Sequence, residues 1–136
     1  MTTRILRPDA ATDRPYVPGL LTNGDLIFVS GQIPMRDGRI VDDSIEHQVE
    51  VVFENIKSVL ADAGASLDDI VRCGLYLADL DTLPRVNQAY EQALGSHRPT
   101  RTTVGVTLPG YDVEIDCIAV VPTGSTTNGR DTAPTT

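Results

Sequence analysis

Apolar residues recur at three- and four-residue steps over residues 44–63, the spacing that places them on one face of an α-helix. Asp43 is the predicted N-cap, and Glu46, three residues later, completes a predicted capping box. Gly64 follows the last apolar position and is the predicted stop, because glycine readily takes the left-handed conformation that ends many helices. The pattern therefore predicts a long amphipathic helix with a solvated outer face.

A shorter helix is predicted over residues 82–94 by the same apolar spacing. Asp81 is its predicted cap, a proline falls in the first turn, where it is tolerated, and Gly95 is predicted to end it. Each helix has a single apolar face, so both are expected to pack on the same underlying layer.

Alternating or continuous apolar runs predict β-strands around the two helices. Asn23-Gly24 separates two such runs and predicts a tight hairpin, and Asp37-Gly38 predicts a second turn followed by a short strand. Later strands are predicted over residues 70–78, 101–108 and 113–121. Helices that alternate with strands in this order predict an α+β fold, with a mixed sheet and both helices packed on one face.

The 136-residue chain is long enough for one domain with a buried core and too short for two. We expect a single domain over residues 1–122, beginning with an extended arm over 1–15, and a disordered, dispensable Thr-rich tail over 123–136. Apolar runs are too short for a transmembrane helix or a signal peptide. Cys73 and Cys117 lie in apolar runs, so we predict buried thiols in a cytoplasmic protein.

The chain carries a formal net charge of −8, with 11 Lys and Arg against 19 Asp and Glu. Nucleic-acid binding depends largely on basic side chains that neutralise phosphates, so this composition argues against a nucleic acid as partner. The His and Cys residues have no metal-ligand spacing, and no metal is expected. One arginine is nevertheless sufficient to anchor a small anion.

Two charged residues stand out in the last two predicted strands. We predict a hairpin in which a loop over 109–112 pairs Leu108 with Val113, so that the apolar sets of both strands face the helices. Arg101 and Glu114 then share the opposite face, but lie six residues apart, which is roughly 20 Å at ~3.3 Å per residue. A guanidinium and a carboxylate on one face are typical of a site for a small carboxylic acid. At that separation they can meet only between subunits, which predicts an oligomer interface.

Several sequence blocks resemble the YjgF/RidA family, the reactive intermediate deaminases. The resemblance covers roughly residues 8–121 and includes a glycine-containing strand, the Asn-x-x-Tyr of the second helix, and the two charged strands just described. The matching blocks, in order, are 15–16 (PY), 27–34 (IFVSGQIP), 54–60 (ENIKSVL), 63–71 (AGASLDDIV), 86–90 (VNQAY), 99–101 (PTR) and 113–115 (VEI).

The resemblance implies a chorismate-mutase-like α+β fold, a homotrimer with pockets between subunits, and no metal or organic cofactor. It also implies hydrolysis of short-lived 2-imino acids and their enamine tautomers, such as 2-aminoacrylate, 2-iminopropanoate and 2-iminobutanoate, to 2-oxo acids and ammonia. A membrane or nucleic-acid partner is not expected.

The resemblance also assigns roles to individual residues. Arg101 would hold the substrate carboxylate through a bidentate fork, Glu114 would position water or move a proton, and Tyr16 would line the pocket and lend its hydroxyl. The substrate-binding residues would be Ser30, Gly31, Asn87 and Thr103.

Two departures from the family pattern bear on substrate choice. Thr103 stands where many members have a cysteine, and Pro18 stands where a glutamine is frequent. The Pro18 departure keeps open a family member with a different substrate, and in all there are three alternatives to a broad deaminase. They are a protein that binds a 2-oxo acid without turnover, a pathway-specific member acting on a different imine, and RNA cleavage, against which the acidic composition argues.

Overall fold

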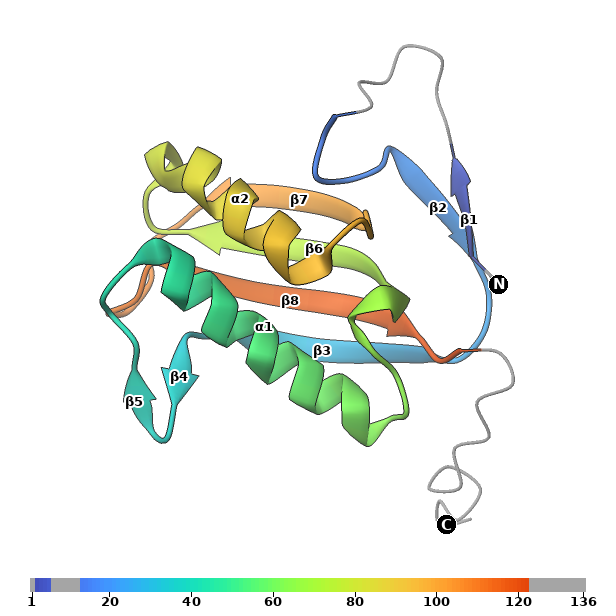
Figure 1. The fold of residues 1–136 in the computed structure, drawn as a ribbon, viewed down its shortest axis with the longest axis horizontal. Coiled ribbons are helices and arrows are strands. Elements are labelled where there is room, and N and C mark those ends of the chain that lie inside the picture. The colour runs from blue at the N-terminus through green and yellow to red at the C-terminus, as the bar shows by residue number, and fades with distance from the viewer. Residues whose placement is uncertain (1, 6–12, 123–136) are drawn as a thin grey trace.

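The computed structural model describes residues 2–5 and 13–122, and its elements confirm the predicted α+β fold (Figure 1). Much of the predicted arm and the whole tail over 123–136 lie outside the described residues. The strands are β1 (Thr2–Ile5), β2 (Gly19–Thr22), β3 (Leu26–Gln32), β4 (Met35–Arg36), β5 (Arg39–Ile40), β6 (Ile70–Leu77), β7 (Thr100–Gly105) and β8 (Val113–Val120). The helices are α1 (Ile45–Asp62) and α2 (Leu83–Leu94), with short 3₁₀ turns at Leu67–Asp69 and Leu80–Thr82.

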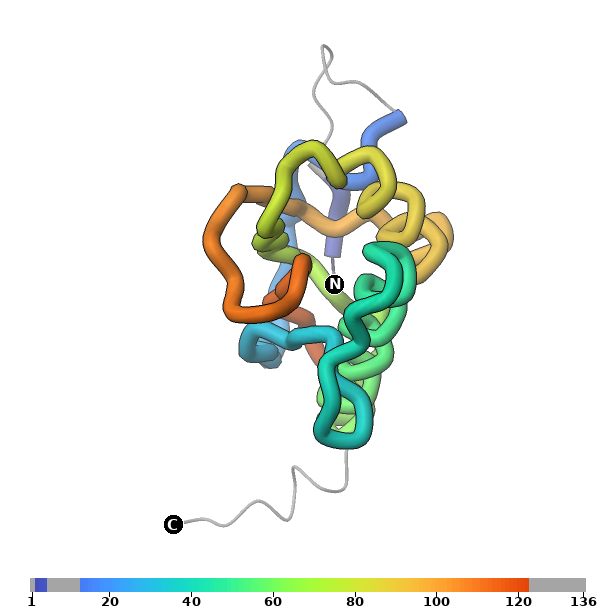
Figure 2. The backbone as a smooth tube through the Cα atoms, turned by 90° about the vertical axis from the view of Figure 1, so that its left-hand side faces the viewer, coloured from blue at the N-terminus to red at the C-terminus, as the bar shows by residue number. Residues whose placement is uncertain are grey.

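The main sheet has four strands in the order β3-β8-β6-β7. Strand β8 pairs antiparallel with both β3 and β6, whereas β7 runs parallel to β6. Helix α1 crosses over β3 and β8, and α2 lies over β6 and β7 (Figure 1). Figure 2, turned by 90°, shows the two helices on the same side of the sheet. The mixed sheet with both helices on one face is therefore as predicted.

The predicted hairpin of the last two strands is wrong, because β6 lies between β7 and β8. Strand β6, helix α2 and strand β7 form a crossover unit, in which a helix carries the chain back so that the second strand runs parallel to the first. The segment after β7 then passes the end of β6 to reach β8, and the backbone N–H of Val106 donates to Leu77 O (2.9 Å) on the way.

The two Gly turns differ. Asp37 and Gly38 have φ angles of 53° and 76°. They form the predicted turn, which joins β4 to the short strand β5 in a tight hairpin. The hairpin predicted at Asn23-Gly24 is wrong, because β2 pairs with β1 and β3 pairs with β8. Gly24 has φ 118°, and a Cβ there would lie 3.0 Å from Val120 Cγ1. Glycine at this position therefore allows the backbone to pass close to the end of β8.

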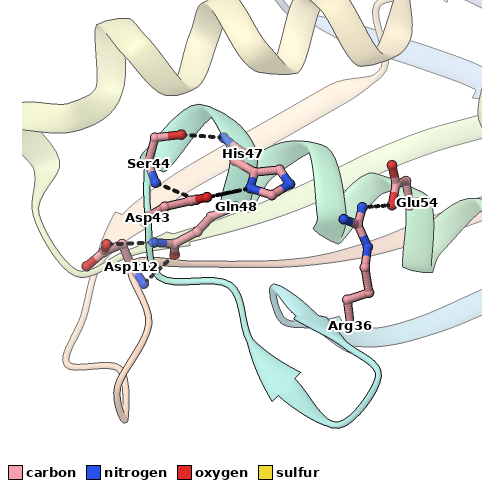
Figure 3. A network of polar contacts seen from close by, with 7 residues as sticks. All are labelled: Arg36, Asp43, Ser44, His47, Gln48, Glu54 and Asp112. Atoms are coloured by element: carbon pink, nitrogen blue, oxygen red, sulfur yellow. Dashed lines mark hydrogen bonds and ion pairs between the residues drawn. The ribbon is translucent and has the colours of Figure 1, made fainter.

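Both helices end just before the predicted glycines, but neither begins at its predicted N-cap. Ser44, not Asp43, is the N-cap of α1: its Oγ accepts from His47 N at 3.1 Å, while Asp43 Oδ1 accepts from Ser44 N at 2.6 Å (Figure 3). Glu46, the expected capping-box partner, instead accepts two hydrogen bonds from Arg85 of α2.

Helix α2 has Thr82 as its N-cap and shows no side-chain cap, so the prediction of Asp81 is also wrong. The 3₁₀ turn that precedes α2 has Asp79 as its N-cap, and the Asp79 carboxylate accepts from Asp81 N at 2.9 Å. Gly64 and Gly95, with φ of 75° and 62°, follow the two helices as predicted.

The hydrophobic core lies between the helices and one face of the sheet. Leu75 and Ile115, in the two central strands, are fully buried there, and both cysteines are free and buried, as predicted. Burial raises the pKa of the Cys73 thiol to about 11 and that of Cys117 to about 12. Gln48 is the one charged or polar residue buried among those described, and it ties α1 to the segment before β8 through two hydrogen bonds with Asp112, both 2.9 Å (Figure 3).

Within the described residues, neither helix combines the length and hydropathy that crossing a membrane requires.

Candidate functional site

Arg101 lies on the helix-covered side of the sheet, which corrects the predicted arrangement. In the parallel register of β6 and β7, Arg101 is the partner of Cys73 and Thr103 is the partner of Leu75. Cys73 and Leu75 are both in the core beneath the helices, and in-register partners share a face. Arg101 and Thr103 therefore point toward α2. Val104 belongs to the apolar set of this strand that was predicted to face the helices, but it is 41% exposed on the other face of the sheet.

Polar and aromatic groups surround the Arg101 guanidinium. Its Nη1 donates to Asn87 Oδ1 of α2 at 2.8 Å. Its Cζ lies 4.9 Å from the ring centroid of Tyr90 and 5.1 Å from that of Tyr16, both within the range of a cation–π interaction. Burial lowers the pKa of Arg101, yet no carboxylate of the described residues forms an ion pair with it. A half-buried cation without an anion is the feature expected of an anion-binding site.

Tyr16 comes to this position because the segment before β2 is tied to the start of β7. Val17 N donates to Pro99 O at 3.2 Å, and Pro15 and Val17 are buried on either side of Tyr16. The Tyr16 hydroxyl accepts from Arg14 Nη1 at 2.9 Å, so its own proton stays available to donate. The structure therefore brings Tyr16 together with Arg101 and Asn87, two other predicted site residues.

Two hydroxyls near Arg101 are buried without a hydrogen-bond partner among the described residues, those of Thr103 and Tyr90. Burial raises the pKa of Tyr90 well above its usual value, so the phenol stays protonated. Buried polar atoms usually have a partner, and exceptions often mark functional positions. Tyr90 was not a predicted site residue. It lies three residues after Asn87 in α2, and because residues at this spacing share a helix face, the spacing could have indicated that Tyr90 lies beside Asn87 in the site.

Glu114 lies on the opposite, open face of the sheet. It alternates along β8 with the buried Val113 and Ile115, and its Oε1 accepts from the Tyr111 hydroxyl at 3.2 Å. A Cβ at Gly31 would overlap the Glu114 carboxylate, so the absence of a side chain there lets the carboxylate lie across β3. Glu114 and Arg101 of one chain therefore face away from each other.

Ser30 and Gly31 occupy an irregularity in the pairing of β3 with β8, where Val29 pairs with Cys117 but Gln32 pairs with Ile115. Two residues of β3 thus face one residue of β8, which is a β-bulge. Ser30 is exposed, and its carbonyl accepts from Gln32 Nε2 at 3.0 Å. The bulge places both predicted substrate-binding residues beside Glu114 and away from Arg101.

Asp116 follows Glu114 on the open face and has other partners. It accepts from the Tyr76 hydroxyl at 2.9 Å and pairs with Arg72 at 3.4 Å. The hydrogen bond to Asp116 raises the pKa of Tyr76. A Cβ at Gly74 would overlap this carboxylate, as one at Gly31 would overlap Glu114. The two carboxylates differ in that Asp116 already has a cation.

The predicted site residues therefore form two groups in one chain. Arg101, Tyr16, Asn87 and Thr103 lie on the helix side, at the edge strand β7, whereas Glu114, Ser30 and Gly31 lie on the open face. Two hollows of about 620 and 510 Å³ lie elsewhere, one beside β1 and Arg98 and one between the helices, and neither is lined by Arg101 or Glu114.

Comparison with known proteins places this arrangement in a family. The family model described as "Endoribonuclease L-PSP" matches residues 5–121. The chain is 36% identical over 123 residues to the mitochondrial protein mmf1 of Schizosaccharomyces pombe, covering 87% of this chain and 75% of that protein. It is 39% identical over 111 residues to the "Putative regulator AldR" of Lactococcus lactis, covering 79% and 87%.

Among solved structures, E. coli TdcF with bound serine is similar at a TM-score of 0.67 and 36% identity, with 78% of this chain and 87% of that chain covered. The family match spans nearly all of the ordered elements, from the end of β1 to the residue after β8. The chain belongs to the YjgF/RidA family, whose model carries the endoribonuclease L-PSP description.

Proposed function

We propose that this protein hydrolyses 2-imino acids and their enamine tautomers to 2-oxo acids and ammonia. The observation that carries the proposal is Arg101, a half-buried guanidinium held by Asn87, Tyr16 and Tyr90 that lacks a carboxylate partner in the described part of the chain. A guanidinium presents parallel N–H donors that match a carboxylate in bidentate fashion. A relative whose structure holds bound serine, an amino acid with the same carboxylate, supports this role for the site.

The chemistry needs little beyond placement of the reactants. Water adds to C2 of the imine, the C2–N bond then breaks, and ammonia leaves with the proton it gains, so that imine and water give 2-oxo acid and ammonia. Arg101 holds the carboxylate next to C2, and the Tyr16 hydroxyl, which accepts from Arg14, has its own proton to donate. A positioned general acid or base typically contributes ~10²–10⁴-fold.

We further propose that Glu114 of the partner subunit supplies the base, in a homotrimer. Three observations support this arrangement. Arg101 and Glu114 of one chain face opposite ways, and Arg101 sits at the edge strand of the sheet. The open face also exposes apolar side chains, with Phe28 71% and Leu26 50% accessible, as is typical of a face that another protein covers.

The test is release of pyruvate and 2-oxobutanoate downstream of a serine/threonine dehydratase, with semicarbazide competing for the free imine. We expect the wild type to accelerate oxo-acid release, and Arg101→Ala to abolish the acceleration. Arg39→Ala is the matched control, because Arg39 is an exposed arginine on β5, in the hairpin with β4 and outside both groups of site residues. No acceleration by the wild type would overturn the proposal.

A second candidate is a protein that binds a 2-oxo acid as a regulator, without turnover. The name of the similar lactococcal protein, a putative regulator, favours it, and the Arg101 group needs no Glu114 to bind an anion. Glu114→Gln separates the two candidates. For a hydrolase, we expect this variant to lose turnover and keep affinity for 2-oxobutanoate. If the wild type binds 2-oxobutanoate but does not speed imine hydrolysis, the regulator is supported.

A further inference from the structure

A second arginine stands at the same tyrosine as Arg101. Arg14 Nη1 donates to the Tyr16 hydroxyl at 2.9 Å, and Arg14 Cζ lies 5.9 Å from the Tyr16 ring centroid. Arg101 Cζ lies 5.1 Å from the same centroid, so the two guanidinium carbons are no more than the sum of these distances, 11.0 Å, apart. Tyr16 is thus contacted by two cations.

Arg14 and Arg101 differ from four other arginines of the described residues, which make ion pairs. Arg36, Arg72, Arg85 and Arg98 each pair with a carboxylate of the described chain. Arg14 and Arg101 form no such pair within residues 2–5 and 13–122, although the chain has an excess of acidic residues. Each guanidinium has five N–H donors, and the hydrogen bonds just described use one on each. Donors therefore remain on both for a second anionic group.

We infer that the site takes 2-imino acids that carry a second carboxylate at the end of the side chain, with four or five carbons in all. The inference rests on the proposed function and names its substrate class. Arg101 holds the carboxylate next to the imine, and Arg14 pairs with the distal carboxylate across Tyr16. Such compounds arise when an oxidase removes two electrons from the C2–N bond of an acidic amino acid.

The reach of the substrate is compatible with this assignment. The carboxyl carbons of a four- or five-carbon diacid are about 4–5 Å apart, given ~1.5 Å per C–C bond. Each end then makes a charge-assisted contact of about 2.8 Å between heavy atoms. The C–N bonds of the two guanidinium groups and the C–O bonds of the two carboxylates add further length. The diacid can therefore bridge the two guanidinium carbons even at their greatest possible separation of 11.0 Å. A monocarboxylic imine would use Arg101 alone.

Arg14 is exposed, which sets the size of the expected effect. An ion pair at an accessible position contributes up to about 1 kcal/mol, equivalent to about a fivefold change in affinity. Arg14 is therefore a residue that sets preference, and its removal should change the ratio between diacids and monoacids rather than abolish binding.

The experiment measures binding by calorimetry for two oxo acids, 2-oxoglutarate and 2-oxobutanoate, with wild type, Arg14→Gln and the control Arg39→Gln. We expect Arg14→Gln to reduce the preference for 2-oxoglutarate about fivefold and Arg39→Gln to leave it as in the wild type. A preference unchanged in Arg14→Gln, or equal losses for both ligands, would overturn the inference. Equal losses would mean that Arg14 only orients the Tyr16 hydroxyl.

Turnover separates this inference from the proposed function. The same variants are assayed with 2-iminoglutarate, made from glutamate by an oxidase, and with 2-iminopropanoate, made from alanine. If the wild type hydrolyses 2-iminopropanoate while Arg14→Gln leaves the diacid preference unchanged, only the inference fails. If neither imine is hydrolysed but the binding preference depends on Arg14, the proposed hydrolysis fails and the diacid site stands.

Discussion

The two faces of the sheet differ in how completely one chain covers them. Beneath the helices, Leu75 and Ile115 are fully buried, whereas on the opposite face of the same sheet Phe28 is 71% exposed. The two helices of the same chain cover this face, and few polar groups are buried beneath them. The open face combines exposed apolar side chains with two carboxylates that lie over glycines. One chain thus completes its core on one side of the sheet, and the other side is the surface on which we propose that a second copy packs.

The largest expected effect concerns the open face. Phe28→Glu places a charge among the exposed apolar side chains of this face, so we expect complete loss of self-association, measured by analytical ultracentrifugation. The fold of the single chain should persist, because Phe28 is 71% exposed in it, and the far-ultraviolet circular dichroism spectrum checks this. An oligomer that survives the substitution would show that this face is not the interface.

On the covered face, Leu75→Ala removes a fully buried side chain between the sheet and the helices. Substitutions of this kind leave a cavity, and we expect the free energy of unfolding to fall by about 3 kcal/mol. Urea denaturation gives the value. A loss below about 1 kcal/mol would mean that the helices adjust over the gap and that the covered face is less rigid than its burial suggests.

Thr103 is a polar exception on the covered face, with a buried hydroxyl and no described hydrogen-bond partner. Thr103→Val has nearly the same shape and removes the unpaired group, so we expect the ligand-free protein to gain about 1 kcal/mol in stability. Thermal denaturation with and without 2-oxobutanoate is the measurement. If the hydroxyl contacts substrate, the variant gains stability but loses affinity; a less stable variant would mean that the hydroxyl is already satisfied.

The smallest effect lies on the outer side of the helices, where Arg85 of α2 donates to Glu46 of α1. This hydrogen bond lowers the Glu46 pKa from 4.5 to about 2. The contact therefore stabilises the fold above pH 4.5, and that contribution is lost as the pH falls toward 2. In Arg85→Ala the Glu46 pKa should return toward 4.5 by NMR titration. An unchanged pKa would assign the shift to the helix terminus instead.

Periodicity predicted the type and approximate extent of both helices and of strands β6, β7 and β8, because apolar spacing reports which residues are buried. Strand β4 and the two 3₁₀ turns were not predicted. Periodicity also did not predict which strands are neighbours. Val104 and Val106 suggested a core stripe, and this assignment turned Arg101 to the wrong face. In the edge strand β7, Arg101 and Thr103 point toward α2 and Val104 points to the open face. Alternation shows that the two sets lie on opposite faces, but it does not show which face the helices cover.

The site residues show the same limit. Arg101, Tyr16, Asn87 and Thr103 are predicted from a resemblance, and the structure places them in one group. Arg14 and Tyr90 were not predicted as site residues, because nothing in their local sequence indicates that they lie beside the tyrosine and the arginine of the site. An exposed arginine in an arm and an aromatic residue on an apolar helix face are common in sequences. Only the fold shows that Tyr90 contacts Arg101 and that Arg14 contacts Tyr16, which lies against Arg101.

The central place of β8 has a consequence for biosynthesis. This strand is the last of the sheet to be made, yet it lies between β3 and β6 and pairs with both. Until residues 113–120 leave the ribosome, β3 and β6 each lack a neighbour, and the apolar sides of both helices have no continuous layer to cover. The earlier strands therefore stay without their central partner until β8 is made, and the sheet closes in one late step. We expect the β8 segment to be the point at which chaperone assistance matters most.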